Sequence, residues 1–185
     1  MQITAILSDY DGTLCPTGSI RNKKENIIPE SLEDILWNIS EKIPVCIVSS
    51  KDFSFLHSKT KFARIVSCMM GIETIILKKH KHAATKTGSS NSSFKCDNSL
   101  DCIESRHLLS SDKILQVNSM LLTSLANEIL LNFSQTITVE RKFTSDERTL
   151  AGITIDWRHI KDWKSFKVES EPHLKLIRKK QRNIC

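Results

Sequence analysis

The stretch Ile6-Leu7-Ser8-Asp9-Tyr10-Asp11-Gly12-Thr13-Leu14 decides the expected fold, because an apolar strand runs there directly into an acidic turn. Asp9 and Asp11 place two carboxylates where the strand ends, and Gly12 follows them. This layout suits phosphoryl transfer, with Asp9 as the nucleophile on phosphorus and Asp11 as the acid that protonates the leaving alkoxide and later activates water. Gly12 lets the backbone turn tightly, so that the N–H groups of Gly12 and Thr13 can approach phosphate oxygens.

The same acidic pair predicts a metal ion. A carboxylate attacks an anionic phosphate poorly unless a cation offsets the repulsion, so the chemistry implies Mg²⁺ held by Asp9 and Asp11. The alternative is that the two acidic residues only form a solvated turn, since Asp-x-Asp pairs occur by chance in many loops. The apolar run Ile3–Leu7 before the pair and the Gly-Thr-Leu sequence after it favour phosphoryl transfer.

Length and composition describe an ordinary globular chain. With 185 residues the chain can bury one core, or a core and a small second module. Its 39% hydrophobic and 26% charged residues are typical of globular proteins. No apolar run approaches transmembrane length and no leader begins the chain, so we expect a cytoplasmic protein without a membrane partner. Six scattered cysteines predict reduced thiols rather than a disulfide framework.

The net charge of +6 would suit an anionic partner. The basic residues gather in two acid-free segments, residues 78–95 and 175–182. Aromatic residues do not alternate with the basic ones as they do in base-stacking surfaces, so a nucleic-acid partner is not expected. The simpler interpretation is a solvated basic loop and a basic C-terminal tail.

The first 77 residues predict an α/β core. Short apolar runs without alternation predict buried strands, and amphipathic stretches between them predict helices. We expect strands at 3–8, 45–48, 63–66 and 74–77, with helices at 32–42 and 52–56. Strands that alternate with helices in this way favour a doubly wound parallel sheet.

Residues 78–185 predict a linker followed by an α+β module. Residues 85–99 are rich in Ser, Thr, Asn and Lys and indicate a loop. Asp112 then begins an amphipathic helix, and two alternating segments, 136–143 and 150–158, predict an antiparallel hairpin. Residues 159–185 are expected to be largely helical and basic.

A second set of polar residues follows the strand at 45–48. Ligands bind at the carboxyl ends of the strands in a doubly wound sheet, and Ser49, Ser50 and Lys51 lie there. A hydroxyl with adjacent N–H groups can donate to a phosphoryl oxygen, and Lys51 can add positive charge. The alternative for Ser49 is that it caps the following helix. The expected phosphate-binding residues are therefore Gly12, Thr13, Ser49, Ser50 and Lys51.

These two segments resemble a known family. Asp9–Thr13 resembles the first motif, Asp-x-Asp-Gly-Thr, of the haloacid dehalogenase (HAD) superfamily of phosphohydrolases. Val45–Asp52 resembles the second motif, in the Ile-Val-Ser-Gly-Arg form of trehalose-6-phosphate phosphatases, with Ser50 at the Gly and Lys51 at the Arg. The resemblance implies a HAD-like core with a cap, Mg²⁺ as cofactor, and hydrolysis of a small sugar phosphate through an aspartyl-phosphate, as in trehalose biosynthesis.

The predicted hairpin resembles the cap of these phosphatases, in which a Glu-x-Lys sequence precedes a hydrophobic strand that ends in a His-aromatic-Arg triplet. Glu140, Lys142 and Arg158 match this pattern, whereas Asp156 stands where the His is found. The resemblance implies that Glu140, Lys142 and Arg158 contact the sugar. The alternative is that they form cross-strand ion pairs on an exposed hairpin face.

Two later motifs of the superfamily are not found in the chain. They are a catalytic Lys and a Gly-Asp-x-x-x-Asp sequence that completes the metal site. Two aspartates are a thin ligand set for Mg²⁺, which requires several oxygen ligands. Missing strands would also leave an open sheet edge, which favours a homodimer or a partner chain that supplies the remaining core. The alternative function is a catalytically incomplete protein that binds sugar phosphate or regulates.

Overall fold

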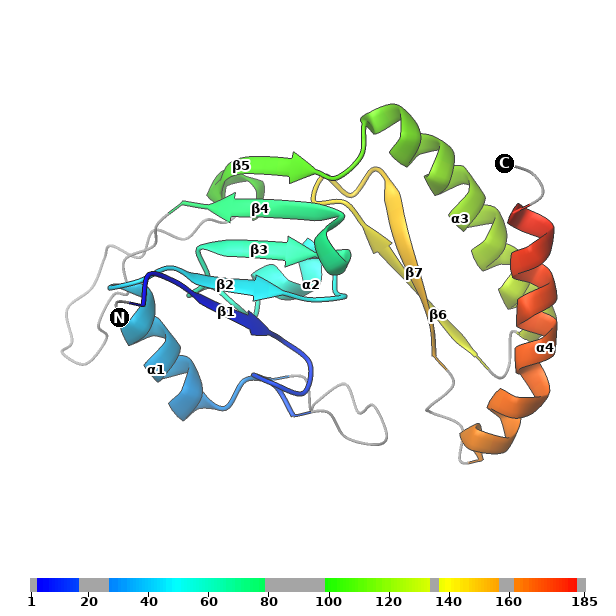
Figure 1. Cartoon of the computed structure of the whole chain (residues 1–185), viewed down its shortest axis with the longest axis horizontal. Helices are drawn as coiled ribbons and strands as arrows, with labels where there is room; N and C mark the ends of the chain where they lie inside the picture. Colours follow the sequence, from blue (N-terminus) through cyan, green and yellow to red (C-terminus); the bar gives the residue numbers. More distant parts are fainter. Residues whose placement is uncertain (1–2, 17–26, 79–98, 134–136, 157–161, 183–185) are drawn as a thin grey trace. The chain divides into compact units, whose positions relative to one another are not determined.

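The computed structural model describes residues 3–16, 27–78, 99–133, 137–156 and 162–182 of the chain. Within these residues the chain forms two compact units, the first extending to Leu109 and the second beginning at Ser110. Each unit has its own sheet and its own helices (Figure 1). The two units are described separately.

Unit 1 is built on a five-stranded sheet with the order β1-β2-β3-β4-β5 (Figure 1). The strands are β1 (Ile6–Asp9), β2 (Val45–Val48), β3 (Ile65–Cys68), β4 (Glu73–Leu77) and β5 (Ile103–Leu108). β1, β2 and β3 run parallel, whereas β4 and β5 continue the sheet in the antiparallel sense. The predicted α/β class is confirmed, although the sheet is mixed rather than wholly parallel.

The helices of unit 1 are α1 (Glu30–Ser40), α2 (Phe53–His57) and two short 3-10 segments, η1 (Met69–Gly71) and η2 (Ser99–Cys102). α1 follows Pro29 and buries Leu36. α2 begins after Asp52, whose Oδ1 accepts a hydrogen bond from the N–H of Phe55 at 3.0 Å. This side-chain cap satisfies a backbone donor that the first helical turn leaves without a partner.

The core of unit 1 follows the strand period. Val45 and Ile47 in β2 and Ile75 in β4 are completely buried, and the residues between them are partly exposed. One side of each of these strands therefore carries the tightly packed apolar layer, as alternation of side chains across a strand requires. The sheet thereby fixes the ends of β1 and β2 in one place.

β5 lies beyond residue 77, where the sequence placed the end of the core. Its residues are mostly polar, so no apolar run marks the strand. It joins the sheet through β4, where the fully buried Glu73 accepts a hydrogen bond from Nε of Arg106 at 2.5 Å. Because of this pairing, the core unit extends to Leu109.

The cysteines differ in part from the expectation. Cys15, Cys46 and Cys68 are free thiols. Cys102 is disulfide-bonded. The prediction of reduced cysteines is therefore correct for the first three and wrong for Cys102.

Unit 2 consists of α3 (Asp112–Phe133), the hairpin of β6 (Thr138–Phe143) and β7 (Leu150–Asp156), and α4 (Trp163–Arg182). Ile129, Ile137 and Leu174 form its buried cluster, and Val139, Ile153 and Ile155 of the hairpin pack against it. Both helices lie on one face of the hairpin (Figure 1). The predicted antiparallel hairpin and the helix from Asp112 are confirmed.

α3 is also long and apolar enough to cross a membrane by length and composition, with a mean hydropathy of 1.3 over its best window. This differs from the expectation that no apolar run approaches that length. Apolar core helices satisfy the same two criteria. α3 packs its inner face on β6 and β7, which accounts for its buried apolar residues.

Candidate functional site

The candidate site lies where β1 and β2 end. Their parallel register places Asp9 opposite Val48, so the turn after Asp9 and the turn that begins at Ser49 leave the sheet at the same edge. Parallel strands present their carboxyl ends together, and this edge is where ligands bind in open α/β sheets. The structure therefore brings together the two segments that the sequence singled out.

The turn after β1 is closed by backbone hydrogen bonds. The carbonyl oxygen of Tyr10 accepts from the N–H groups of Leu14 at 3.1 Å and Cys15 at 3.0 Å. The N–H of Gly12 donates to the carbonyl of Cys15 at 2.8 Å, and Gly12 has a φ of 82°. The tight turn predicted at Gly12 is present, but its N–H is already used and cannot also bind a phosphate. Thr13 is exposed at the tip of the turn.

The two carboxylates have different surroundings. Asp9 is exposed, and its Oδ1 accepts a hydrogen bond from the N–H of Tyr10 at 2.8 Å. Asp11 is half-buried, and its Oδ1 is inaccessible and has no hydrogen-bond partner among the described residues. A buried carboxylate oxygen without a partner is uncommon in folded proteins, and it indicates a proton, a cation or a ligand at that position.

The fit of this site to Mg²⁺ is partial. Mg²⁺ requires oxygen ligands in octahedral array, and Asp9 and Asp11 supply two carboxylates at one turn. The buried oxygen of Asp11 is an available donor of the correct chemical kind. Across the described ranges, however, no group of three or more His, Cys, Asp or Glu side chains can hold a metal. The described residues account for part of a magnesium site.

Tyr10 and Cys15 do not compete for the role of nucleophile. Burial raises the pKa of the Tyr10 phenol far above its ordinary value, and the neighbouring Cys15 and Asp11 add to the rise. Burial likewise raises the pKa of the Cys15 thiol. Both groups therefore remain protonated at neutral pH, and a protonated thiol is a weak nucleophile. Asp9 is the nucleophile that the turn leaves.

Ser49 is held firmly at the end of β2. Its N–H donates to the carbonyl of Ser67 at 3.0 Å, and its Oγ accepts from the N–H of Lys51 at 3.2 Å. Only 1% of Ser49 is exposed. Asp52, rather than Ser49, caps α2, so the capping alternative for Ser49 is wrong. Ser50 is exposed beside it, and Lys51 is buried.

Three residues missed by the sequence support this loop. Met69, Met70 and Gly71 all have positive φ, at 52°, 58° and 95°. The N–H of Met70 donates to the carbonyl of Ser49 at 2.9 Å, and the N–H of Met69 donates to that of Lys51 at 2.9 Å. Two consecutive non-glycine residues in the left-handed region cost free energy, and such strain is concentrated at functional sites. Gly71 was the only sequence signal of this turn.

Phe55 links two lysines to the acidic turn. The Nζ of Lys51 lies 4.9 Å from the centre of the Phe55 ring, and the Nζ of Lys59 lies 5.1 Å from it. Phe55 in turn packs edge-on against Tyr10 with ring centres 5.7 Å apart. Because Tyr10 stands between the two aspartates, both ammonium groups belong to the neighbourhood of the site. Lys59 was not predicted, since no motif marks it.

The predicted cap residues lie in unit 2. Glu140 and Lys142 are on the same face of β6, opposite to Arg141, which donates to Oδ1 of Asn127 in α3 at 2.8 Å. That places Glu140 and Lys142 on the face of the hairpin turned away from α3. Glu140 is half-buried and Lys142 is buried, so the exposed ion-pair alternative does not describe Lys142. Arg158 lies outside the described residues.

No family model and no curated protein matches the chain. Among solved structures, the C-terminal domain of C. albicans trehalose-6-phosphate phosphatase matches 90% of this chain at 18% identity, with a TM-score of 0.56. A trehalose-6-phosphate phosphatase related protein matches 75% of this chain and 48% of its own at 15% identity, with a TM-score of 0.48. A HAD subclass IIB sugar phosphatase matches 83% of this chain and 44% of its own at 12% identity, with a TM-score of 0.36.

The chain spans 47% of the length of the C. albicans domain that it matches. The likeness is one of fold, because the shared identity is low. It agrees with the resemblance carried by Asp9–Thr13 and Val45–Asp52. The chain therefore has a HAD-like α/β fold with an α+β cap module, similar to that of trehalose-6-phosphate phosphatase.

Proposed function

We propose that this chain is the Mg²⁺-dependent catalytic part of a sugar-phosphate phosphatase that works through an aspartyl-phosphate. The observation that carries the proposal is the acidic turn itself. Asp9 is exposed at the end of β1, and Asp11 holds a buried oxygen without a partner among the described residues. A nucleophile that is open to substrate, beside an acid–base group shielded from water, is the arrangement that the reaction needs.

The proposed reaction has two steps. A carboxylate oxygen of Asp9 attacks phosphorus, the bond from phosphorus to the sugar oxygen breaks, and protonated Asp11 gives its proton to that oxygen. Asp11 then takes a proton from water, the hydroxide attacks phosphorus, and the bond to Asp9 breaks to release inorganic phosphate. Mg²⁺, when held by Asp9 and Asp11, would offset the negative charge that the phosphoryl group brings. Lys51 and Lys59 add positive charge nearby.

The substrate proposal rests on the cap face. Glu140 and Lys142 lie on the hairpin face away from α3, and a carboxylate with an ammonium group can bind the hydroxyls of a sugar. Trehalose 6-phosphate is the first candidate, because the C. albicans protein of similar fold is a trehalose-6-phosphate phosphatase. Ser49, Ser50 and Lys51 would bind the phosphoryl group.

A second candidate is a sugar-phosphate binding or regulatory protein. It is favoured by the absence, in the ranges that the structure describes, of any cluster of three metal-ligating side chains. It is also favoured by the chain spanning less than half of its structural relative. An incomplete metal site weakens catalysis far more than it weakens binding.

A partner that completes the sheet belongs to either proposal. β1 pairs only with β2 among the described strands, so its other edge is open. Leu7 in β1 is 73% exposed, although it belongs to an apolar strand. Open edges that carry apolar side chains favour pairing with another strand. We propose a homodimer through β1, or else a partner chain that supplies the adjoining strands.

Phosphate release by the purified chain tests the function. With trehalose 6-phosphate and Mg²⁺ we expect release that EDTA abolishes and that Asp9→Asn lowers by about a hundredfold or more, because the nucleophile is lost. Asp34→Asn is the matched control, since Asp34 is an exposed aspartate of α1. Binding of sugar phosphate by calorimetry without any release would decide for the second candidate.

A further inference from the structure

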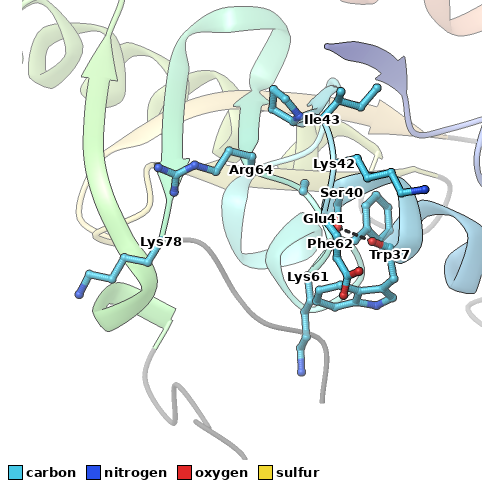
Figure 2. Close-up of a pocket in the computed structure, with 11 residues that line it drawn as sticks. Trp37, Ser40, Glu41, Lys42, Ile43, Lys61, Phe62, Arg64 and Lys78 are labelled. Carbon is cyan, nitrogen blue, oxygen red and sulfur yellow. Dashed lines mark hydrogen bonds between the residues drawn. The ribbon is translucent and has the colours of Figure 1, made fainter. Parts of the chain in front are cut away.

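Unit 1 has a second candidate site at the other end of its sheet (Figure 2). Pro44 precedes β2, Arg64 precedes β3, and Lys78 follows the antiparallel β4, so these three residues gather at one edge. It is the edge opposite to Asp9 and Ser49. A pocket of about 250 Å³ opens there between the end of α1 and the turn before β3.

The pocket is held in shape by the backbone. The N–H of Arg64 donates to the carbonyl of Val45 at 2.8 Å, and the N–H of Leu77 donates to the carbonyl of Arg64 at 2.9 Å. The N–H of Lys78 donates to the carbonyl of Cys102 at 2.8 Å. Its walls are therefore parts of the sheet and not a loop that must first become ordered, which lowers the entropy cost of binding.

The charge of the pocket is strongly positive. Lys42, Lys61, Arg64 and Lys78 line it, against one acidic residue, Glu41. Lys78 donates from Nζ to a backbone carbonyl, that of Asp101, at 2.7 Å, which leaves its charge uncompensated. Within the described part of the chain, neither Lys42 nor Lys61 is in an ion pair. Several like charges around one cavity raise the local concentration of anions.

Arg64 is only partly neutralised. Its Nη2 pairs with Glu104, whereas its Nη1 is buried and has no hydrogen-bond partner among the residues described. An anion in the pocket would lie close to this guanidinium group. It would relieve part of the cost of the buried charge without replacing Glu104.

The remaining wall is aromatic. Trp37 of α1 lines the pocket beside Phe62, with the two ring centres 6.4 Å apart in an edge-on arrangement (Figure 2). Phe62 is buried and Trp37 is half-buried, so part of the indole is available to a ligand. An indole face packs against flat or weakly polar rings.

From the charge, the aromatic wall and the volume together, we propose that this pocket binds a small ring compound that carries a phosphate group. A volume near the lower end of ligand pockets admits one ring with its phosphate and not a larger molecule. The ring would pack on Trp37, and the phosphate would lie among Lys42, Lys61 and Arg64. Nucleotides and sugar phosphates share this chemistry. The site is separate from the one proposed for catalysis and does not depend on it.

Calorimetric titration of the whole chain with three probes tests the proposal. We expect AMP or glucose 6-phosphate to bind more tightly than inorganic phosphate, because only the first two carry a ring. Tighter binding of AMP identifies a nucleotide site, and tighter binding of glucose 6-phosphate identifies a sugar-phosphate site. The preference for the ring compound is expected to disappear in Trp37→Leu.

Charge variants of opposite sign place the binding in this pocket. Lys61→Gln is expected to weaken the binding of the preferred probe by about two- to fivefold, and Glu41→Gln to strengthen it by a similar factor, since each changes one partly exposed charge. Lys113→Gln, at an exposed lysine of α3, is the control and should change nothing. Lys42→Gln repeats the test if Lys61→Gln folds poorly.

Three results would overturn the proposal. One is that none of the probes binds. Another is that affinities are the same in Lys61→Gln, Glu41→Gln and the unchanged chain, which would place the binding elsewhere. The third is equal affinity for inorganic phosphate and both ring compounds, which would leave no role for Trp37.

Discussion

Asp11 combines two properties that rarely occur together in a residue with only a structural role. It is half-buried, and its Oδ1 has no hydrogen-bond partner in the described part of the molecule. Leaving a buried acceptor without a partner costs about 1–3 kcal/mol. A turn that served only to connect β1 to the next segment would do better with Ser or Asn at this position. The cost is understandable if Asp11 exchanges protons with a substrate.

Gly12 provides a test of the turn at the scale of one residue. Its φ of 82° lies in the left-handed region, which a Cβ atom disfavours by about 1–2 kcal/mol. We expect Gly12→Ala to lower the free energy of unfolding by about that amount, measured by urea denaturation, and to lower phosphate release as the carboxylates shift.

Gly152→Ala is the matched control for this substitution. Gly152 in β7 has no positive φ, and a Cβ there would meet Lys142 at an ordinary 3.8 Å. We expect a stability equal to or slightly above that of the unchanged chain. Equal losses of stability in the two variants would show that the left-handed turn at Gly12 is not what matters.

At the scale of the element, apolar runs and capping residues predicted most of the structure. Val45–Val48 is a strand with the predicted bounds, and the helix after Asp52 begins where its cap requires. β5 was missed because Ile103–Leu108 is mostly polar and joins the sheet by pairing, which a local pattern does not show. The left-handed Met69 and Met70 were missed because a methionine gives no signal for positive φ.

The candidate site was predictable in the same measure. Asp9, Asp11 and Ser49 come together because parallel strands end at one edge, and this rule needs only the order of the strands. Lys59 and Phe55 were not predictable, since their place beside Tyr10 depends on how α2 packs. The role expected for the Gly12 N–H failed because a backbone carbonyl within the turn already accepts it.

The pair of Glu73 and Arg106 tests the attachment of β5. Glu73 is completely buried in β4 and accepts from Nε of Arg106 in β5. We expect Arg106→Leu to lower the free energy of unfolding by about 2–3 kcal/mol, because the carboxylate would remain buried without its cation.

The double variant Glu73→Leu/Arg106→Leu is the control. It removes both charges, so we expect it to regain most of the stability that Arg106→Leu loses, as measured by chemical denaturation. A double variant as unstable as the single one would mean that the two strands are joined by packing at Arg106 rather than by the ion pair.

At the scale of the whole molecule, the open edge of β1 and the length of the chain point the same way. The chain spans 47% of its C. albicans relative, and β1 has one partner among the described strands. Sedimentation velocity tests the homodimer proposal. We expect a mass of twice the 21.1 kDa of one chain, and a shift toward the monomer in Leu7→Lys, which places a charge at the open edge.

Leu131→Lys is the control for this measurement. Leu131 is 85% exposed on α3, and we expect its substitution to leave the mass unchanged. A single 21.1 kDa species at every concentration would contradict the homodimer. Loss of the dimer in Leu131→Lys but not in Leu7→Lys would place the interface on unit 2.

The central claim is that the carboxylate of Asp9 becomes phosphorylated. Borohydride reduces an acyl phosphate to an alcohol, so an acid-quenched reaction with trehalose 6-phosphate and Mg²⁺ would convert the side chain at position 9 to that of homoserine. We predict that peptide mass spectrometry finds this change at position 9, most strongly in Asp11→Asn, where the second step is slowed, and not in Asp9→Asn. An unmodified position 9 in Asp11→Asn, or a label on another residue, would contradict the account.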